Sequence, residues 1–270
     1  QEGRLIMGRV GLALLVQEFW DRARDRWVLT ISALFALLCS AVTLYGKGAD
    51  DAGTQLTGPS LVTLTSLLVP LVALVLGHDA VVGERERNTL GMLLSLPVSR
   101  FEVVLAKFAG RLLALLCSIA LGLGAATAVA HGQSAVLLRL ALPTSLLGAS
   151  FLALGILISA VSRRQVIAAS LVVVSWFCLV FFYDLGLLGL LIASDGGVSS
   201  QTVGWLVSVN PAGLFRTEML RSFSGPGALE HLGMSSWGPG RTAEVLIWLG
   251  WSVLPIAISG LLMTREKELR

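Results

Sequence analysis

The chain has 270 residues, of which 55% are hydrophobic and 14% are charged, and its mean hydropathy is +0.81. A soluble domain usually carries about 25% charged residues. This composition excludes an ordinary soluble enzyme and a disordered chain, and three cysteines are too few for a disulfide-rich secreted module. The net charge of +3 is too small to indicate a nucleic-acid partner. The composition therefore predicts an all-α, polytopic membrane protein embedded in a lipid membrane.

The N-terminal segment is amphipathic. Apolar residues recur at helical spacing from Leu12 to Ala23, whereas Gln17, Glu18 and Asp21 fall on the opposite face. This pattern predicts a helix that lies in the headgroup plane. We expect residues 1–27 to form an elbow helix that leads into the first span, and the alternative is a simple membrane anchor. No cleaved signal peptide is expected, because the first apolar run is too long for a signal sequence.

Six charge-free runs are long enough to cross a bilayer, which takes roughly 20 apolar residues. They predict spans at 28–45, 61–82, 106–130, 140–162, 166–183 and 243–263, within a single transmembrane domain over 1–270. Most of the 20 Lys and Arg residues then share one side with both termini. The opposite side holds Lys47, Arg139, Arg216, Arg221 and Arg241. The positive-inside rule therefore predicts cytoplasmic N- and C-termini.

The fourth and second spans carry polar or small residues that need an explanation. Small residues of the fourth span share a face and predict close helix packing within the chain, with a dimer contact as the alternative: Ser145, Gly148, Ala149, Ala153, Gly155 and Ser159. His78 and Asp79 lie near the cytoplasmic end of the second span, where charge is costly. They indicate either a structural ion pair with Arg85 or Arg87, or a role in gating or coupling.

The cytoplasmic loop between the second and third spans contains a short amphipathic segment. Its apolar residues Leu90, Leu93, Leu94 and Pro97 are spaced as on one helix face. Thr89 is suited to cap this helix, and four alternating charges precede it: Glu84, Arg85, Glu86 and Arg87. A charged flank beside one apolar face is typical of a helix that docks into a groove of another protein. A solvated connector with an interfacial helix is the alternative.

Residues 184–242 are expected to form an outer, periplasmic region. A helix is predicted to begin at Ser199–Thr202 and to end at Asn210–Pro211, and a second is predicted over residues 212–221. Asp184 is expected to cap a helix or to lie at the interface. Apolar residues of the second helix are expected to dip into the outer membrane surface: Leu214, Phe215, Met219 and Leu220. Interfacial anchoring is expected for Trp205, Trp237, Trp248 and Trp251.

The run Glu84-Arg85-Glu86-Arg87-Asn88-Thr89-Leu90, followed by Leu93–Arg100 and then Lys107, resembles the coupling-helix segment of ABC-2 type ABC transporter permeases. Asn88 stands where that pattern usually has Gly, and Gly91 stands where it usually has Glu. Asn88 still suits a turn, because Asn tolerates positive φ. The resemblance assigns residues 84–100, including Arg100, to the coupling helix that contacts the ATPase, and it implies re-entrant helices before the last span.

The resemblance also implies partners and a location. The chain has no G-x-x-x-x-G-K-[ST] phosphate loop, so ATP and Mg would be bound by a separate ATPase subunit, and this chain would be neither an enzyme nor a cofactor-binding protein. Six spans are half of the usual complement, which implies a homodimer with two ATPase copies in a bacterial inner membrane. Arg163 and Arg164 would form a minor second contact or simply set the topology. A narrower resemblance, over Gly77–Leu90 and Glu18–Trp27, is to permeases that serve copper-site assembly in nitrous oxide reductase with a periplasmic partner.

No metal or catalytic site is predicted. Cys39, Cys117 and Cys178 lie in three different spans without a C-x-x-C motif, and such isolated cysteines are typical packing residues. An intramembrane protease is disfavoured, because G-x-S-G and H-E-x-x-H motifs are absent. A scaffold that holds a periplasmic assembly without transport remains an alternative. The substrate is left open: copper, a sulfur compound or none.

Overall fold

The computed structural model describes residues 2–48, 51–89, 91, 99–130, 134–195, 197–224 and 239–265. Throughout these ranges the fold is helical, with no strand, and six helices are long and apolar enough to cross a membrane. These spans cover residues 28–45, 58–86, 100–129, 137–161, 165–193 and 241–263. The prediction of an all-α, six-span membrane protein is confirmed, because each span overlaps one of the charge-free runs of the sequence.

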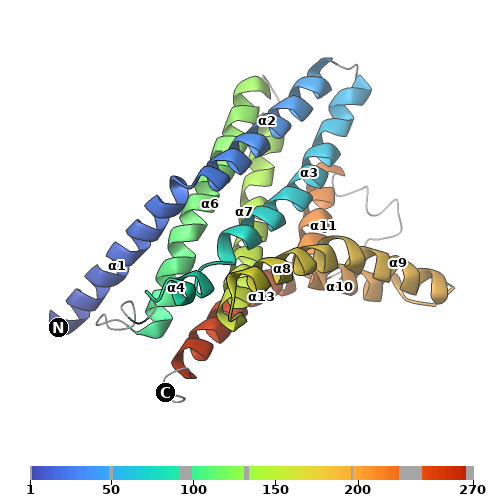
Figure 1. Ribbon diagram of the computed structural model, residues 1–270. Helices are drawn as coiled ribbons and strands as arrows, with labels where there is room; N and C mark the ends of the chain where they lie inside the picture. The colour runs from blue at the N-terminus through green and yellow to red at the C-terminus, as the bar shows by residue number, and fades with distance from the viewer. Residues whose placement is uncertain are drawn as a thin grey trace.

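Four long helices form the body of the bundle. α2 (Arg26–Gly48) packs on α6 (Arg100–Ala130), and α3 (Asp51–Gly77) packs on α7 (Ser134–Val161). α13 (Arg241–Arg265) covers a further face of α7, which makes α7 the central helix. The bundle and both termini are visible in Figure 1, where N and C lie toward the same end as the short helix α4 (Val82–Glu86). We call this the α4 end; its placement in the cytoplasm stays a prediction.

The packing face of the fourth span is confirmed as a contact within the chain. Gly155 lies against the backbone of α3, where an added Cβ would come within 2.8 Å of the Leu74 carbonyl oxygen. A Cβ on Gly77 would equally lie 2.9 Å from the Gly155 backbone. Ala153 is completely buried. Only residues without bulky side chains allow α3 and α7 to approach this closely.

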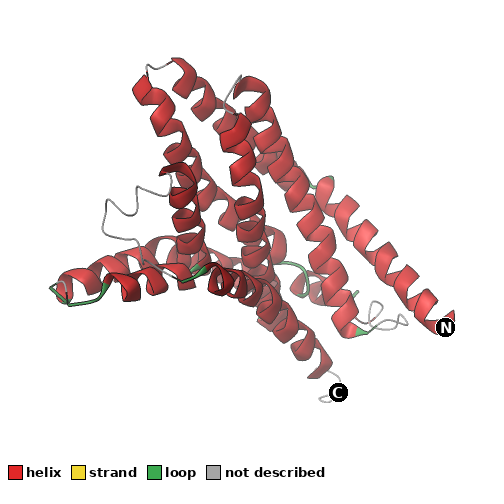
Figure 2. Ribbon diagram, turned by 180° about the vertical axis from the view of Figure 1, so that it is seen from behind, coloured by secondary structure: helices red, strands yellow, loops and turns green. Residues whose placement is uncertain are grey.

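The N-terminal helix α1 (Glu2–Ala23) is separate from the first span. The helical pattern breaks at Arg24–Asp25, and α2 begins at Arg26. α1 packs along α6 rather than standing alone. Figure 2 shows it from behind, running along the edge of the bundle to the N-terminus. Leu12, Val16 and Trp20 point away from the protein and are exposed.

The fifth span is longer than the sequence analysis predicted. It comprises α8 (Gln165–Phe177), a π-helical turn η1 (Cys178–Phe182) and α9 (Tyr183–Ala193), so that it ends ten residues beyond the predicted boundary at Tyr183. Residues 185–193 are apolar, small or glycine, and the one charge, Asp184, forms an ion pair with Arg216. The helix therefore continues past the predicted boundary as far as Ala193, while a periplasmic position for the residues that follow and an interfacial position for Asp184 stay predictions.

Two helices follow the fifth span, as predicted. α10 (Ser200–Val209) begins at Ser199, whose hydroxyl accepts a hydrogen bond from the Thr202 amide at 3.2 Å. α10 lies beside α9 and projects from the bundle (Figures 1 and 2). Asn210 ends α10 and donates to the Leu179 carbonyl in η1 at 2.6 Å. A π-helical turn interrupts the regular α-helical pattern of backbone hydrogen bonds, and the Asn210 side chain provides a donor to the Leu179 carbonyl there.

The helix α11 (Pro211–Ser224) turns back into the bundle and packs on α7 and α3. Leu214, Phe215 and Met219 are buried there, so the prediction that they dip into the outer membrane surface is wrong; Leu220 is exposed. Trp248 is likewise buried rather than interfacial, and Trp251 donates to the Val209 carbonyl at 2.8 Å. Trp237 lies outside the described residues. The sequence pattern marked these residues as apolar, but only the return of α11 gave them a protein environment.

Candidate functional site

Six charged side chains meet at the α4 end, where α1, the end of α3, α4 and α6 come together. We call them the charge cluster: Glu18, Arg22, Asp79, Glu84, Lys107 and Arg111. Three carboxylates and three cations make the cluster formally neutral. A buried charge is tolerated only when it is paired and hydrogen-bonded, and this cluster meets that condition by drawing its members from α1, α4, α6 and the turn after α3.

Lys107 connects the N-terminal helix with the coupling segment. Its ammonium nitrogen lies 2.6 Å from Glu18 Oε1 and 3.0 Å from Glu84 Oε1. The side chain of Lys107 is 8% exposed, so both contacts are shielded from solvent. The single cation therefore holds α1 and α4 against α6.

Arg111, one turn further along α6, is fully buried. Its Nη1 donates to Asp79 Oδ1 at 2.6 Å and to the Leu76 carbonyl, and its Nη2 donates to Glu18 Oε1 at 3.3 Å. Arg22 donates to the other oxygen of Asp79 at 2.8 Å. The sequence analysis placed Asp79 opposite Arg85 or Arg87; that pairing is wrong. The third span and the N-terminal helix supply its partners, because Asp79 points toward α6 at the end of α3.

The close approach of α1 to α6 depends on Gly110. A Cβ at this position would lie 2.7 Å from the Leu15 carbonyl oxygen and 2.8 Å from Glu18 Cβ. The absence of a side chain thus lets Glu18 reach Lys107 and Arg111. The prediction that Glu18 lies on the solvated face of an interfacial helix is wrong for this residue, which is 9% exposed.

The electrostatic environment of Glu18 favours its charged form. Burial raises the pKa of this carboxyl, but the nearby positive charges of Arg111, Lys107 and Arg22 lower the pKa by more than burial raises it. The pKa of Glu18 is therefore below the ordinary value. Glu18 therefore remains a carboxylate at neutral pH and keeps its two cations in place.

The helix α4 ends in a Schellman motif, which explains Asn88. Arg87 is the C-cap, and Asn88 adopts the left-handed conformation with φ +57°. The Thr89 amide donates to the Glu84 carbonyl at 3.1 Å, and the Asn88 amide donates to the Arg85 carbonyl at 3.3 Å. These are the two bonds that define the motif, in which Gly is commonest and Asn is the usual substitute. The expectation that Asn88 serves a turn is confirmed.

The hydroxyl of Thr89 also contacts Glu84. It donates to the Glu84 side-chain carboxylate, whose other oxygen holds Lys107. Glu84 thereby ties Thr89, near the end of the described part of this segment, to the charge cluster. The predicted cap by Thr89 concerns a helix that lies largely outside the described residues.

A second set of contacts joins α4 to the turn between α7 and α8. The hydroxyl of Ser159 accepts hydrogen bonds from the amides of Val81 and Val82, at 2.9 and 3.0 Å. Arg85 donates to the Ser162 carbonyl, and Glu86 accepts from the Gln165 amide at 2.7 Å. Three of the residues predicted to face an ATPase, namely Glu84, Arg85 and Glu86, thus have partners within their own chain.

The remaining predicted coupling residues divide into three groups. Arg87 and Asn88 are exposed beside the loop. Arg100 donates to the Met263 carbonyl at the end of α13. The apolar face of the coupling helix lies outside the described residues: Leu90, Leu93, Leu94 and Pro97.

The predicted polar pair His78–Asp79 does not act as a pair. The Nδ1 atom of His78 lies at hydrogen-bond distance from the Val75 carbonyl of its own helix, whereas Asp79 belongs to the charge cluster. In the sequence, Lys107 contributed to the charge asymmetry and to the family pattern, and Arg111 only to the charge asymmetry. Their spacing of four residues places both on one face of a predicted span, and that face was the available signal for a buried cluster.

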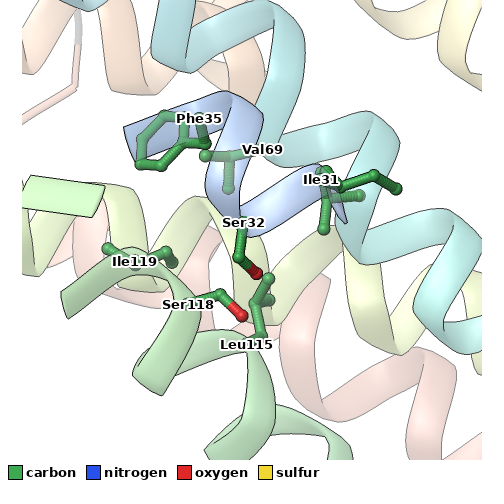
Figure 3. A pocket seen from close by; sticks show the side chains of 8 residues that line it. Ile31, Ser32, Phe35, Val69, Leu115, Ser118 and Ile119 are labelled. Atoms are coloured by element: carbon green, nitrogen blue, oxygen red, sulfur yellow. The ribbon is translucent and has the colours of Figure 1, made fainter. Parts of the chain in front are cut away.

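A small apolar cavity lies between α2, α3 and α6, with Phe35, Val69 and Leu115 in its wall (Figure 3). Its two hydroxyls are occupied, because Ser32 donates to the Val28 carbonyl at 2.6 Å and Ser118 to the Ala114 carbonyl at 3.0 Å. The cavity therefore offers packing space and no free polar group to orient a ligand.

The cysteines are distributed over separate helices. Cys39 is buried in α2, and Cys117 and Cys178 are exposed on α6 and η1. Across the described part of the chain, no group of three or more His, Cys, Asp or Glu side chains is placed to hold a metal ion.

Ion pairs also join α11 to its neighbours, away from the charge cluster. Arg221 of α11 pairs with Glu244 at the start of α13. Half-buried Glu218 lies near this pair: burial raises its pKa, and the negative charge of Glu244 raises it further. A hydrogen bond from Trp248 and the charges of Arg241 and Arg221 offset only part of this shift.

Six helices long and apolar enough to cross a membrane, within the described part of the chain, define a multi-pass membrane protein. Residues 12–267 match the ABC-2 family transporter protein family, and the chain belongs to this family. It is 35% identical over 256 residues to the probable ABC transporter permease protein NosY of Stutzerimonas stutzeri, which covers 88% of this chain and 93% of that protein.

The corresponding NosY of Pseudomonas aeruginosa PAO1 is 34% identical over 266 residues, covering 93% of this chain and 96% of that protein. The chain is therefore an ABC transporter permease subunit of the bacterial inner membrane. Membership of this family also implies an ATPase partner.

Proposed function

We propose that this permease transmits ATP-driven movement of a separate ATPase subunit into its membrane helices, and that the charge cluster is the element that receives it. One observation carries the proposal: Lys107 holds Glu18 and Glu84 at 2.6 and 3.0 Å, directly before the loop that resembles a coupling helix. A push on that loop would displace α4, and the cluster would make α1 and α6 follow.

The proposed complex contains two copies of this chain and two ATPase subunits, since six spans are half of the usual number in such a transporter. Mg and ATP would be bound by the ATPase. Arg87 and Asn88 are exposed at the end of α4 and are available to a partner. Residues 90–98, by their resemblance to the family pattern, would provide the apolar docking face.

We further propose that the work of this complex serves copper-site assembly in nitrous oxide reductase, together with a periplasmic partner. The similarity to NosY over most of the chain supports this assignment. Whether the cargo is copper, a sulfur compound or none is open within the proposal. In the last case the movement itself would act on the periplasmic partner.

The experiment uses the permease copurified with the ATPase encoded beside it. Arg87→Glu is expected to weaken ATPase binding, because it reverses an exposed charge at the proposed contact. Arg26→Glu is the matched control, since Arg26 is exposed at the start of α2. Glu84→Gln is expected to leave the complex assembled while ATP hydrolysis no longer supports reductase maturation.

The proposal fails if no ATPase copurifies, or if the Arg87→Glu and Glu84→Gln complexes both support maturation as well as the unaltered complex. A gene for an ATPase with a phosphate loop next to the gene of this chain is the first observation to make.

A further inference from the structure

Glu84 and Glu86 extend from opposite sides of the short helix α4. Two residues that are two positions apart on an α-helix are separated by roughly 200° around its axis. Glu84 accordingly reaches Lys107 on the third span at 3.0 Å, and Glu86 reaches the Gln165 amide on the fifth span at 2.7 Å. The two carboxylates of one motif thus contact two different spans.

The contact of Glu86 is at the first residue of α8. The first amides of a helix have no partner within the helix, and the positive end of the helix dipole favours a carboxylate there. The N-cap residue of α8, Arg164, supplies no capping hydrogen bond from its side chain. Glu86 fills this role from a different helix, so the inner end of the fifth span is capped by the segment that precedes the coupling helix.

The contact matters because the other side-chain bonds described between the fifth span and its neighbours lie further along it, at Trp176, Leu179, Tyr183 and Asp184. In its most apolar stretch 17% of residues are buried, against 61% in the central fourth span. Near Gln165, the attachments of α4 are the Ser159 hydroxyl, the Ser162 carbonyl and the Glu86 carboxylate. A displacement of α4 therefore acts on the start of the fifth span through few bonds, of which the one from Glu86 reaches α8 itself.

We infer that Glu86 is a positioning residue that carries the movement of α4 to the fifth span, while Glu84 carries it to the third span through Lys107. This inference rests on the proposed function, and it replaces the prediction that Glu86 contacts the ATPase. Glu86 Oε1 accepts from the first amide of α8, so this carboxylate is engaged within its own chain.

The test records movement of each span separately. Nitroxide labels are attached at Val174→Cys on α8 or at Leu113→Cys on α6, two exposed positions away from both contacts, in a chain whose native cysteines are replaced by Ala. Spectra of the complex with its ATPase are compared without nucleotide and with trapped ATP. In the otherwise unaltered chain, both labels are expected to respond to nucleotide.

The variants should affect the nucleotide responses of the two labels separately. Glu86→Ala is expected to lose most of the response at position 174 and to keep the response at position 113, and Glu84→Gln is expected to do the reverse. Glu86→Gln retains an acceptor oxygen and should restore part of the response at position 174. A merely structural defect would alter both labels alike.

Three results would overturn the inference. One is a response at position 174 that is unchanged in Glu86→Ala. This result would contradict only the role of Glu86 and would leave the proposed function standing. Another is a Glu86→Ala chain that no longer binds the ATPase, which would make Glu86 a partner contact. If neither label responds in the unaltered complex, the proposed function itself fails, and the inference fails with it.

Discussion

The guanidinium of Arg111 lies 2.6 Å from the carboxylate of Asp79, and the two side chains are 1% and 8% exposed. They come from the third and second spans, and Glu18 and Arg22 of the N-terminal helix complete their coordination. The pair joins α1, the turn after α3 and α6 into one unit. Because these charges lie in the protein interior, moving one side chain away would leave its partner as an unpaired buried charge.

Removal of the Arg111 charge should be strongly destabilising. Arg111→Met removes the fully buried cation and leaves Asp79 with Arg22 alone and Glu18 with Lys107 alone, and a loss of about 3–5 kcal/mol in the free energy of unfolding is expected. The double variant Arg111→Met/Asp79→Asn should recover part of this loss, because the carboxylate no longer lacks a partner. Unfolding of the purified protein in detergent measures both. Arg139→Met is the control, since Arg139 is exposed and donates only to the Ser222 carbonyl among the described contacts; a loss of equal size there would contradict the prediction.

Asn88 should tolerate Gly and reject a β-branched residue. Its φ of +57° suits Gly, so Asn88→Gly is expected to be neutral or slightly stabilising. Asn88→Val should cost about 1–2 kcal/mol, since the left-handed conformation brings Cβ close to the carbonyl oxygen. Thermal unfolding compares the two variants. Equal stability of the Val and Gly variants would show that the Schellman motif does not constrain this position.

Gly155 should not accept even one methyl group. Gly155→Ala would place Cβ 2.8 Å from the Leu74 carbonyl oxygen, a backbone atom that cannot move aside cheaply, and about 1–3 kcal/mol of destabilisation is expected. Gly124→Ala on α6 is the matched control, because no atom lies within 4 Å of the added Cβ. The control should gain up to about 1 kcal/mol from helix propensity. The prediction is wrong if both substitutions change the unfolding midpoint in the same direction.

Glu18 should make stability fall in acid. Its pKa in the folded protein is below the ordinary value of 4.5, so its contribution is present above that value and is lost as the pH falls through the lowered pKa. Glu18→Gln should therefore be less stable than the unaltered chain at pH 7, with a difference that shrinks in acid. Unfolding midpoints over a pH series test this, and a difference that does not depend on pH would argue against a charged role.

Glu218 should show the opposite sign. Its raised pKa means that protonation favours the folded state; this contribution is present below 4.5 and is lost as the pH rises through the raised value. Glu218→Gln keeps a hydrogen-bond acceptor for Trp248 without the charge. It should be more stable than the unaltered chain at alkaline pH and similar to it in acid. A stability loss at alkaline pH would show that the carboxylate charge is needed there.

The sequence by itself determined the membrane architecture. Charge-free runs of sufficient length fixed six spans, because the bilayer forbids unpaired charge and unpaired backbone groups alike. Ser199, Asn210 and Asn88 were readable as helix ends because caps and left-handed turns depend on residues close in sequence. The coupling segment was recognisable by resemblance for the same reason: its pattern is contiguous.

Only the tertiary structure decided which charges meet. Glu18, Asp79 and Arg111 are far apart in the chain, and nothing local to any of them names its partner. The approach of α1 to α6 at Gly110 and the turn of the chain after Gly77 bring them together. The burial of Phe215 and Trp248 likewise depends on the return of α11 into the bundle. Periodicity shows that a side chain is apolar or charged, whereas the neighbour it contacts is set by how the helices pack.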